Sequence, residues 1–223
     1  HKIAKQWQGQ VIGIPGTIDN DVDQTDFTIG FSTAVNTAID AIDKIRDTAD
    51  AFERVFLVEV MGRHSGFITF NVGIASAAEQ VLSFENFDCK DKTTRLHELS
   101  ENIKAAQKNR HSSYLIVIAE NLWPDGCTGL AKQLTDLTGI DCTPCILGYI
   151  QRGGSPVAKD RLLATKLGVA AIQAIAENKT HLMMAEQNNS VVDISLAQSI
   201  KHQKQVSASL IKAQSDILSV SKQ

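Results

Sequence analysis

VIGIPGTIDND, at residues 11–21, is an apolar run that passes directly into a loop with two carboxylates. Open α/β sheets bind ligands in the loops that leave the carboxyl ends of their strands. Asp19, Asp21 and the hydroxyl of Thr17 could therefore converge on one ligand, with one acid taking a proton and the other holding a divalent cation through water. The alternative is that the Asp and Asn side chains only satisfy the backbone of a turn, and the residues alone favour that interpretation.

Short apolar runs alternate with helical periods along the rest of the chain. The runs predict strands at residues 10–14, 55–60, 80–84, 114–119 and 145–150. The helical periods predict helices at residues 31–46, 66–78, 93–109, 129–137 and 156–176, the last beginning at Pro156 with Ser155 as its N-cap. Residues 188–223 are expected to form a peripheral helical tail. Strand followed by helix, repeated, indicates an α/β fold with a parallel sheet.

Composition limits the function classes. The chain has 223 residues, is 43% hydrophobic and carries a net charge of −3, so it can bury a substantial core in one or two domains. This charge gives no electrostatic case for binding nucleic acid or a membrane surface. No apolar run approaches the ~20 residues that span a bilayer, and the N-terminus lacks the apolar segment of a signal peptide. We therefore expect a cytoplasmic protein with no membrane or nucleic-acid partner.

Four cysteines, at positions 89, 127, 142 and 145, are too few for a disulfide framework and fit a reducing cytoplasm. Cys142 and Cys145 form a C-x-x-C pair, which could be a redox pair or half of a zinc site. Zinc would need two further ligands at suitable spacing, and no second C-x-x-C is present. We favour reduced cysteines at the edge of a strand.

Three stretches carry a resemblance to a known family. GIPGTIDND at residues 13–21, followed by Thr25-Asp26 and Gly30-Phe31, resembles the catalytic loop of the 6-phosphofructokinases. VEVMGR at residues 58–63 and GYIQRGGSP at residues 148–156 match the same family in the same order and at roughly its spacing. The chain thus resembles a bacterial-type, ATP-dependent 6-phosphofructokinase up to about residue 175, and the resemblance fades in the tail.

The resemblance implies a three-layer α/β/α fold built on a parallel sheet. Residues 1–30 would end the first pass of a nucleotide-binding domain and carry the catalytic loop. Residues 31–148 would form the sugar-phosphate-binding domain, and residues 149–223 would return to the nucleotide domain and add the helical tail. The family's glycine-rich nucleotide-binding segments precede the catalytic loop and are not found in this sequence. We therefore expect this chain alone to be inactive.

The resemblance also implies catalytic roles. Asp19 matches the general base that takes the proton of the sugar's 1-hydroxyl as it attacks the γ-phosphate of ATP. Asp21 matches the acid associated with Mg²⁺ at the substrate, and Thr17 a hydroxyl near the transferred phosphoryl group. Arg63, after the apolar run 55–60, matches the arginine that neutralises charge in the transition state. Phosphoryl transfer needs little more than such positioning and charge neutralisation.

A further group of residues matches the family's binding positions for fructose 6-phosphate. Met61 and Gly62 would place backbone against the sugar, Glu120 would accept hydrogen bonds from its hydroxyls, and Arg152 would bind the 6-phosphate. Arg54 matches an arginine that reaches the site of a neighbouring subunit, which implies a homo-oligomer, a dimer or a tetramer, with a shared sugar site. Effector positions of an allosteric enzyme are matched by Arg46 and Glu79, with a looser basic cluster of Lys108, Arg110 and His111.

Two positions depart from the bacterial pattern. Tyr149 stands where the family has His, and Thr143 stands where it has Arg. Tyrosine can donate one hydrogen bond to phosphate, whereas threonine cannot replace a charged fork. Losing a charge-assisted contact of about 1.5–3 kcal/mol predicts binding of fructose 6-phosphate that is weaker by about tenfold or more.

Gly16 bears on the phosphate donor. Pyrophosphate-dependent relatives typically have lysine at this position, where its ammonium occupies the space of the nucleotide's α-phosphate. Glycine leaves that space open and favours ATP, with Gly16 as a nucleotide-binding position. Two alternatives stay open: a pyrophosphate-dependent phosphofructokinase, and a catalytically silent fragment or regulatory relative that binds sugar phosphate.

Overall fold

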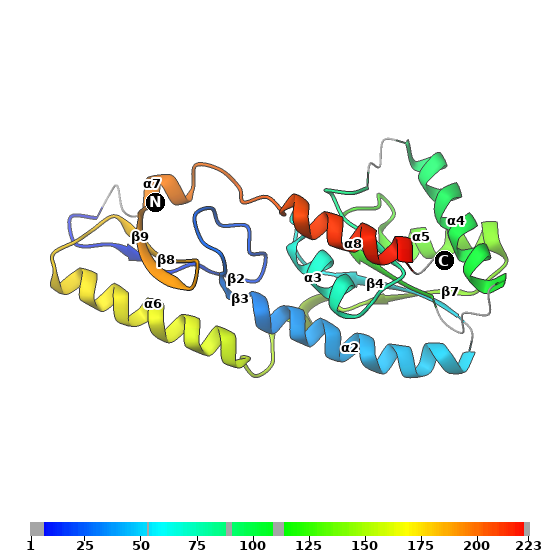
Figure 1. Ribbon diagram of the computed structural model, residues 1–223, viewed down its shortest axis with the longest axis horizontal. Coiled ribbons are helices and arrows are strands. Elements are labelled where there is room, and N and C mark those ends of the chain that lie inside the picture. Colours follow the sequence, from blue (N-terminus) through cyan, green and yellow to red (C-terminus); the bar gives the residue numbers. More distant parts are fainter. Residues whose placement is uncertain (1–6, 53, 88–90, 109–113, 221–223) are drawn as a thin grey trace. The chain divides into compact units, whose positions relative to one another are not determined.

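The structure, a computed structural model, describes residues 7–52, 54–87, 91–108 and 114–220 (Figure 1). Within these ranges the elements are, in chain order, β1 (Ile12–Gly13), β2 (Gly16–Thr17), β3 (Ile29–Gly30), α2 (Phe31–Phe52), β4 (Val55–Val60), α3 (Phe67–Ala75), β5 (Gln80–Leu82), α4 (Lys92–Lys108), β6 (Tyr114–Ala119), α5 (Gly126–Thr138), β7 (Cys142–Ile146), the 3₁₀ helix η2 (Gly148–Arg152), α6 (Ala158–Ala176), β8 (Leu182–Gln187), β9 (Ser190–Ser195), α7 (Leu196–Ser199) and α8 (Ala208–Val220).

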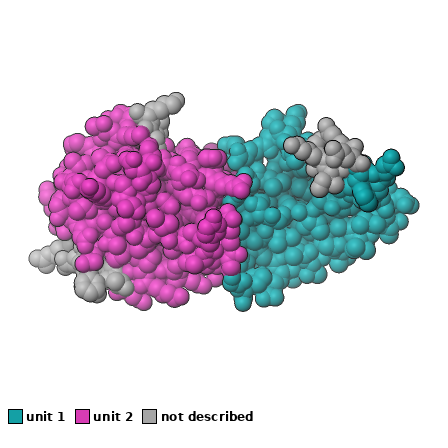
Figure 2. Space-filling model, turned by 180° about the vertical axis from the view of Figure 1, so that it is seen from behind, with its two compact units in different colours: residues 1–34, 154–205 teal, residues 35–153, 206–223 magenta. Residues whose placement is uncertain are grey.

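The chain divides into two compact units (Figure 2). Unit 1 comprises residues 1–34 and 154–205, and unit 2 comprises residues 35–153 and 206–223. The chain therefore passes between the units near residues 34, 153 and 205. Residues 206–223 pack with unit 2.

Unit 2 is built on a four-stranded parallel sheet in the order β5-β6-β4-β7. The central strands β4 and β6 pair along their full length, from Val55 opposite Tyr114 to Val60 opposite Ala119. Both are continuous apolar runs, and every residue of β6 is buried. Such runs are typical of parallel strands that are covered on both faces.

Helices cover both faces of this sheet, so unit 2 has three layers, with the sheet between two layers of helices (Figure 1). Alternate residues of β6, namely Tyr114, Ile116 and Ile118, join one core with Ile103 of α4 and Leu134 of α5. Helix α3 packs on β5 and β6, and α8 packs on α3. The predicted α/β fold with a parallel sheet is confirmed.

Unit 1 contains a three-stranded sheet, β1-β8-β9, and the short parallel pair β2-β3. Helix α6 packs on β1, β3 and β8. It buries Leu163 and Leu167 in a core with Met184 of β8, against which Ile12 and Ile29 pack. Strand β1 thus depends for its pairing on β8, which lies far along the sequence, with Ile12 opposite Leu182.

The prediction of a helical tail is wrong over residues 190–195, where β9 forms an antiparallel hairpin with β8. The turn consists of Asn188 and Asn189, both with positive φ (51° and 63°). A two-residue turn with positive φ at both positions matches the twist of a hairpin and favours Asn. This Asn pair is the sequence signal for the hairpin. The hairpin was missed because residues 182–187 are good helix formers.

Two smaller predictions are also wrong. Helix α6 begins at Ala158, and its N-cap is Val157, which lies in extended backbone and makes no side-chain capping bond. Ser155 and Pro156 therefore precede the helix and do not cap it. Strand β7 spans Cys142–Ile146, and the residues after it, expected to continue the strand, form η2.

Candidate active site

The acidic loop of unit 1, residues 18–28, connects the short paired strands β2 and β3. Thr17 ends β2, and its Oγ1 accepts a hydrogen bond from the backbone N–H of Asp19 at 3.2 Å. Asp19 is buried, with 8% of its surface exposed. The Thr17 carbonyl in turn accepts from Thr28 Oγ1 at 2.6 Å. The structure thus brings Thr17 and Asp19 together, as expected from the sequence.

Asn20 organises this loop in a way that the sequence did not indicate. It is 2% exposed and adopts a left-handed backbone conformation (φ 53°). Its Oδ1 accepts from Thr28 N at 2.9 Å and from Thr28 Oγ1 at 3.3 Å, and its Nδ2 donates to the Asp26 carbonyl at 3.3 Å. The turn interpretation is therefore correct for Asn20, whose side chain satisfies the backbone of this loop.

Asp21 is held by the segment that follows α7. Gln203 Nε2 donates to Asp21 Oδ2 at 3.2 Å, and the Lys204 N–H donates to the Asp21 carbonyl at 3.0 Å. Lys204 Nζ donates to the Asp26 carbonyl at 2.6 Å, and burial lowers the pKa of Lys204. Both residues come from the tail and were not recognised in the sequence, because no local pattern connects them to the loop.

Gly16 lies in β2, opposite Ile29 of β3, and is exposed. A Cβ placed on it would meet no heavy atom of the described chain within 4 Å. The described part of the fold therefore does not require glycine here.

The carboxyl end of β4 carries the second group of predicted residues, in unit 2. Met61, Gly62 and Arg63 follow the strand directly, and Glu120 follows the neighbouring strand β6. Glu120 Oε1 accepts from the backbone N–H of Gly62 at 3.1 Å and of Arg63 at 2.8 Å. One oxygen of Glu120 thus fixes the backbone of the loop.

The backbone of this loop adopts rare conformations. Gly62 has φ 143°, and a Cβ there would lie 2.6 Å from the Ser65 carbonyl oxygen. Arg63, with φ 55°, lies in the left-handed region that side chains seldom adopt. Such conformations persist when surrounding contacts impose them, and they concentrate at functional sites. The exposed Arg63 side chain is held in this way at the end of a buried strand.

The third group lies in η2, after β7. Arg152 stacks on Tyr149, with Arg152 Cζ 5.2 Å from the centroid of the ring, and both side chains are exposed. Gln151, between them, is 1% exposed, and its Oε1 accepts from Met61 N at 2.8 Å. Thr143, which replaces the family's arginine, lies partly buried in β7. The sequence predicted Tyr149 and Arg152 as site residues but missed Gln151.

Arg54 lies at the opposite end of β4 from Arg63. Its Nε forms an ion pair with Asp141 Oδ2 at 3.1 Å. The six residues of β4 separate Arg54 from the Met61–Arg63 loop by about 20 Å. Arg54 therefore does not join Arg63 and Glu120 within one chain.

The predicted effector positions Arg46 and Glu79 and the described cysteines lie in unit 2. Arg46 Nη2 donates to the carbonyls of Ser76 and Ala77, and Arg46 lies 4.0 Å from Glu79, whose Oε2 accepts from Leu115 N. Cys127, Cys142 and Cys145 are free thiols, as predicted for the last two. Burial raises the pKa of Cys127 to about 12. Cys89, Arg110 and His111 lie outside the described residues.

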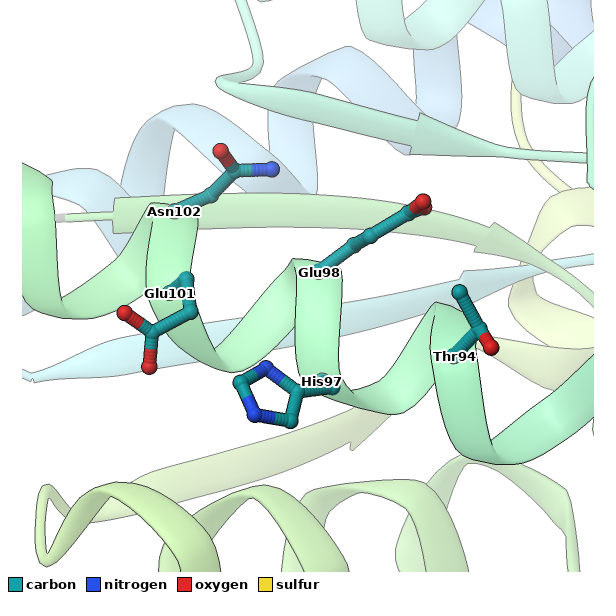
Figure 3. A pocket seen from close by; sticks show the side chains of 5 residues that line it. All are labelled: Thr94, His97, Glu98, Glu101 and Asn102. Atoms are coloured by element: carbon teal, nitrogen blue, oxygen red, sulfur yellow. The ribbon is translucent and has the colours of Figure 1, made fainter.

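A hollow on α4 is separate from all of these residues (Figure 3). It is lined by Thr94, His97, Glu98, Glu101 and Asn102, which project from one helix. Within the described ranges, no group of three or more His, Cys, Asp or Glu side chains is placed to hold a metal ion. Nor does any described helix combine the length and apolarity needed to cross a membrane.

Comparison with known proteins identifies the family. The sequence profile described as Phosphofructokinase matches residues 1–175. The ATP-dependent 6-phosphofructokinase 1 of Thermus thermophilus is 43% identical over 203 residues, which cover 91% of this chain and 61% of that protein. The ATP-dependent 6-phosphofructokinase of Coxiella burnetii is 47% identical over 190 residues, covering 85% of this chain and 56% of that protein.

Solved structures agree with this match. The phosphofructokinase of Saccharomyces cerevisiae superimposes with a TM-score of 0.76 at 33% identity, over 86% of this chain and 26% of the yeast chain. The pyrophosphate-dependent phosphofructokinase of Nitrosospira multiformis gives a TM-score of 0.74 at 25% identity, over 89% of this chain and 54% of that one. The chain spans about 61% of the length of its Thermus relative. The chain belongs to the phosphofructokinase family.

Proposed function

We propose that the full-length protein transfers the γ-phosphoryl group of ATP to the 1-hydroxyl of fructose 6-phosphate and forms fructose 1,6-bisphosphate, a step of glycolysis. The observation that carries this proposal is the loop of Thr17, Asp19 and Asp21. Its turn is held by Asn20, and its buried acid Asp19 is fixed through Thr17. A relative with 43% identity bears the name ATP-dependent 6-phosphofructokinase, which agrees with this assignment.

In this proposal, Asp19 accepts the proton of the 1-hydroxyl while that oxygen attacks the γ-phosphorus. A general base must lie within hydrogen-bonding reach of the proton that it takes, which a fixed loop favours. Arg63 donates hydrogen bonds to the transferred phosphoryl oxygens and neutralises their charge, and Thr17 contributes its hydroxyl. Catalysis by these groups is mainly positioning and electrostatic stabilisation.

Asp21 is the residue of this chain that we assign to Mg²⁺. Mg²⁺ is usually bound through one or two carboxylates together with substrate phosphates, so a single acid fits this donor set. One oxygen of Asp21 is oriented by Gln203. When bound, Mg²⁺ would supply charge neutralisation at the phosphates of ATP.

We assign the sugar phosphate to residues of unit 2. Glu120 Oε2 accepts a hydrogen bond from a sugar hydroxyl, and Met61 and Gly62 place backbone against the sugar. Arg152, oriented by its contact with Tyr149, binds the 6-phosphate. Because Arg54 lies at the far end of β4, its role at a sugar site requires a second subunit, so we propose a homo-oligomer.

We propose ATP as the donor because Gly16 leaves open space where lysine would intrude. A pyrophosphate-dependent enzyme is the second candidate, since a solved structural relative carries that name. The free thiols of Cys127, Cys142 and Cys145 support a cytoplasmic location. Regulation through Arg46 and Glu79 belongs to the same proposal, with both side chains close enough to share one effector.

The test is a steady-state assay of the full-length protein with ATP and with pyrophosphate in separate reactions. Turnover with ATP is expected, and turnover only with pyrophosphate would overturn the choice of donor. Asp19→Ser should lower kcat by ~10²–10⁴ with little change in the KM for fructose 6-phosphate, as expected for a lost general base. Asp23→Ser, in the same loop, is the matched control and should keep kcat. An unchanged kcat in Asp19→Ser would remove Asp19 from the mechanism.

A further inference from the structure

Three consecutive backbone N–H groups at the carboxyl end of β4 are bound by side chains from both neighbouring strands. The N–H groups of Gly62 and Arg63 donate to Glu120, which follows β6. The N–H group of Met61 donates to Gln151, which lies in η2 after β7. Since β4 lies between β6 and β7 in the sheet, the loop is tied on both sides.

The orientation of the Gln151 amide follows from chemistry. Met61 N can only donate, so the amide oxygen and not the NH₂ group must face it. Gln151 Nε2 is buried and has no hydrogen-bond partner among the described residues. Burying an unpaired donor costs stability, so packing alone would favour an apolar side chain at this position. The oxygen that Gln151 presents to Met61 is the evident reason for an amide here.

The loop that Gln151 holds does not adopt its conformation by backbone preference. Gly62 and Arg63 both have positive φ (143° and 55°), and the second value is unfavourable for a residue with a side chain. The hydrogen bonds that Glu120 and Gln151 accept oppose relaxation of this backbone to more favourable φ values. If the Met61 tie were lost, the end of β4 would be less firmly held, and the Arg63 side chain would be less well placed.

Gln151 also lies between the two exposed side chains of η2 that we assign to the sugar phosphate. Its neighbours in sequence include Arg152, which stacks on Tyr149. A buried Gln151 bound to the end of β4 therefore fixes the position of η2 as well as that of the Met61–Arg63 loop. One residue thus connects the loop assigned to the transferred phosphoryl group with the segment assigned to the 6-phosphate.

We propose that Gln151 is a positioning residue for substrate binding and phosphoryl transfer, acting through the Met61 backbone and through η2. The proposal rests on the proposed function for the roles of Arg63 and Arg152. Gln151 itself need not touch the substrate. It sets the distance between Arg63 and Arg152, the two residues that we assign to the phosphoryl groups.

The decisive variant is Gln151→Met, which keeps the length and nearly the volume of the side chain but lacks the strong acceptor. In the full-length enzyme the KM for fructose 6-phosphate should rise by about tenfold, as expected for one lost buried hydrogen bond, and kcat should fall. The KM for ATP should stay unchanged. Gln173→Met, at an exposed position of α6, is the matched control and should match the wild type in all three constants.

Hydrogen–deuterium exchange of the peptide that contains Met61 provides a readout independent of turnover. Gln151→Met should accelerate exchange in this peptide, whereas Gln151→Glu, which keeps an acceptor oxygen, should preserve its protection. Wild-type exchange and wild-type KM in Gln151→Met would overturn the proposal. If Gln151→Met does not fold, loss of Met61 protection in Gln151→Glu overturns it instead. If the wild-type enzyme does not phosphorylate fructose 6-phosphate, the proposed function fails, while exchange still decides whether the tie exists.

Discussion

At the scale of a single residue, Gly16 is a glycine that the described part of the fold does not require. The position is exposed, and its surroundings would accept a Cβ without contact inside 4 Å. Glycine is commonly required by backbone strain or by close packing, and neither reason holds at this residue. The open volume is thus available to a ligand, and we assign it to the nucleotide.

Gly16→Lys should fold normally and discriminate against ATP. The full-length variant should keep the melting temperature of the wild type, and its KM for ATP should rise by about tenfold or more because the ammonium fills the space of the α-phosphate. Gly16→Ala is the control and should behave as the wild type, because a methyl group is too short to intrude. Thermal unfolding and steady-state kinetics measure both effects. Unchanged kinetics with ATP in Gly16→Lys would remove Gly16 from the donor site.

At the scale of an element, the buried amide of Asn20 is one of the groups that stabilise the acidic loop. Asn20 combines a left-handed backbone with three hydrogen bonds, to Thr28 and Asp26. Its backbone conformation and its side chain contribute separately to stability, and two substitutions can separate them.

Asn20→Gly keeps the positive φ but removes the hydrogen bonds, and it should lower the free energy of unfolding by about 1–3 kcal/mol. Asn20→Ala should cost about a further 1 kcal/mol, because alanine is strained at φ 53°. Urea unfolding measures both values. The matched pair Asn189→Gly and Asn189→Ala, at φ 63° in an exposed turn, should show only the difference due to backbone strain. Equal stability of the two Asn20 variants would contradict the strain at this position.

Elements buried on both faces could be predicted well from the sequence. Strands β4 and β6 have the predicted bounds because continuous apolar runs of that length admit few other structures. Strand β9 was missed because its burial is partial and its partner β8 consists of good helix formers. Tertiary pairing overrode local preference there, and only the Asn188-Asn189 turn indicated it.

The site residues divide in the same way. Groups that would touch substrate, such as Asp19 and Arg63, follow predicted strands and could be placed from the resemblance. Asn20 and Gln151 act through hydrogen bonds to the backbone of other segments, and Gln203 acts through a hydrogen bond to the Asp21 side chain. Such contacts depend on which loops meet at a sheet edge, which no local pattern in the sequence specifies.

At the scale of the whole molecule, Glu59 couples the stability of unit 2 to pH. It is a partly buried acid in the central strand β4, and its Oε2 accepts from Cys127 N at 3.2 Å, at the start of α5. Burial raises the pKa of Glu59, the hydrogen bond from Cys127 lowers it, and the charge of Glu120 raises it further. The net shift is upward, so the folded state favours the neutral acid.

Because the folded pKa lies above the unfolded value, the stabilisation by neutral Glu59 is complete below pH ~4.5 and is lost as pH rises through the folded pKa. Glu59→Gln stays neutral and should therefore be more stable than the wild type at pH ~7.5, with a smaller difference at pH ~4. Urea unfolding at both values measures this. A constant difference for Glu59→Gln would show that burial does not perturb this acid.

The three passages of the chain between the units have a consequence for biosynthesis. A ribosome releases all four strands of the unit 2 sheet by residue 146, whereas β1 waits for β8 at residue 182 before it can pair. The loop of Asp19 and Asp21 waits longer still, for Gln203 and Lys204. A nascent chain in which residue 153 has just left the ribosome should thus already carry the sheet of unit 2 but lack an ordered acid pair. The acid pair is thus translated before the sheet of unit 2 but takes its final form after it.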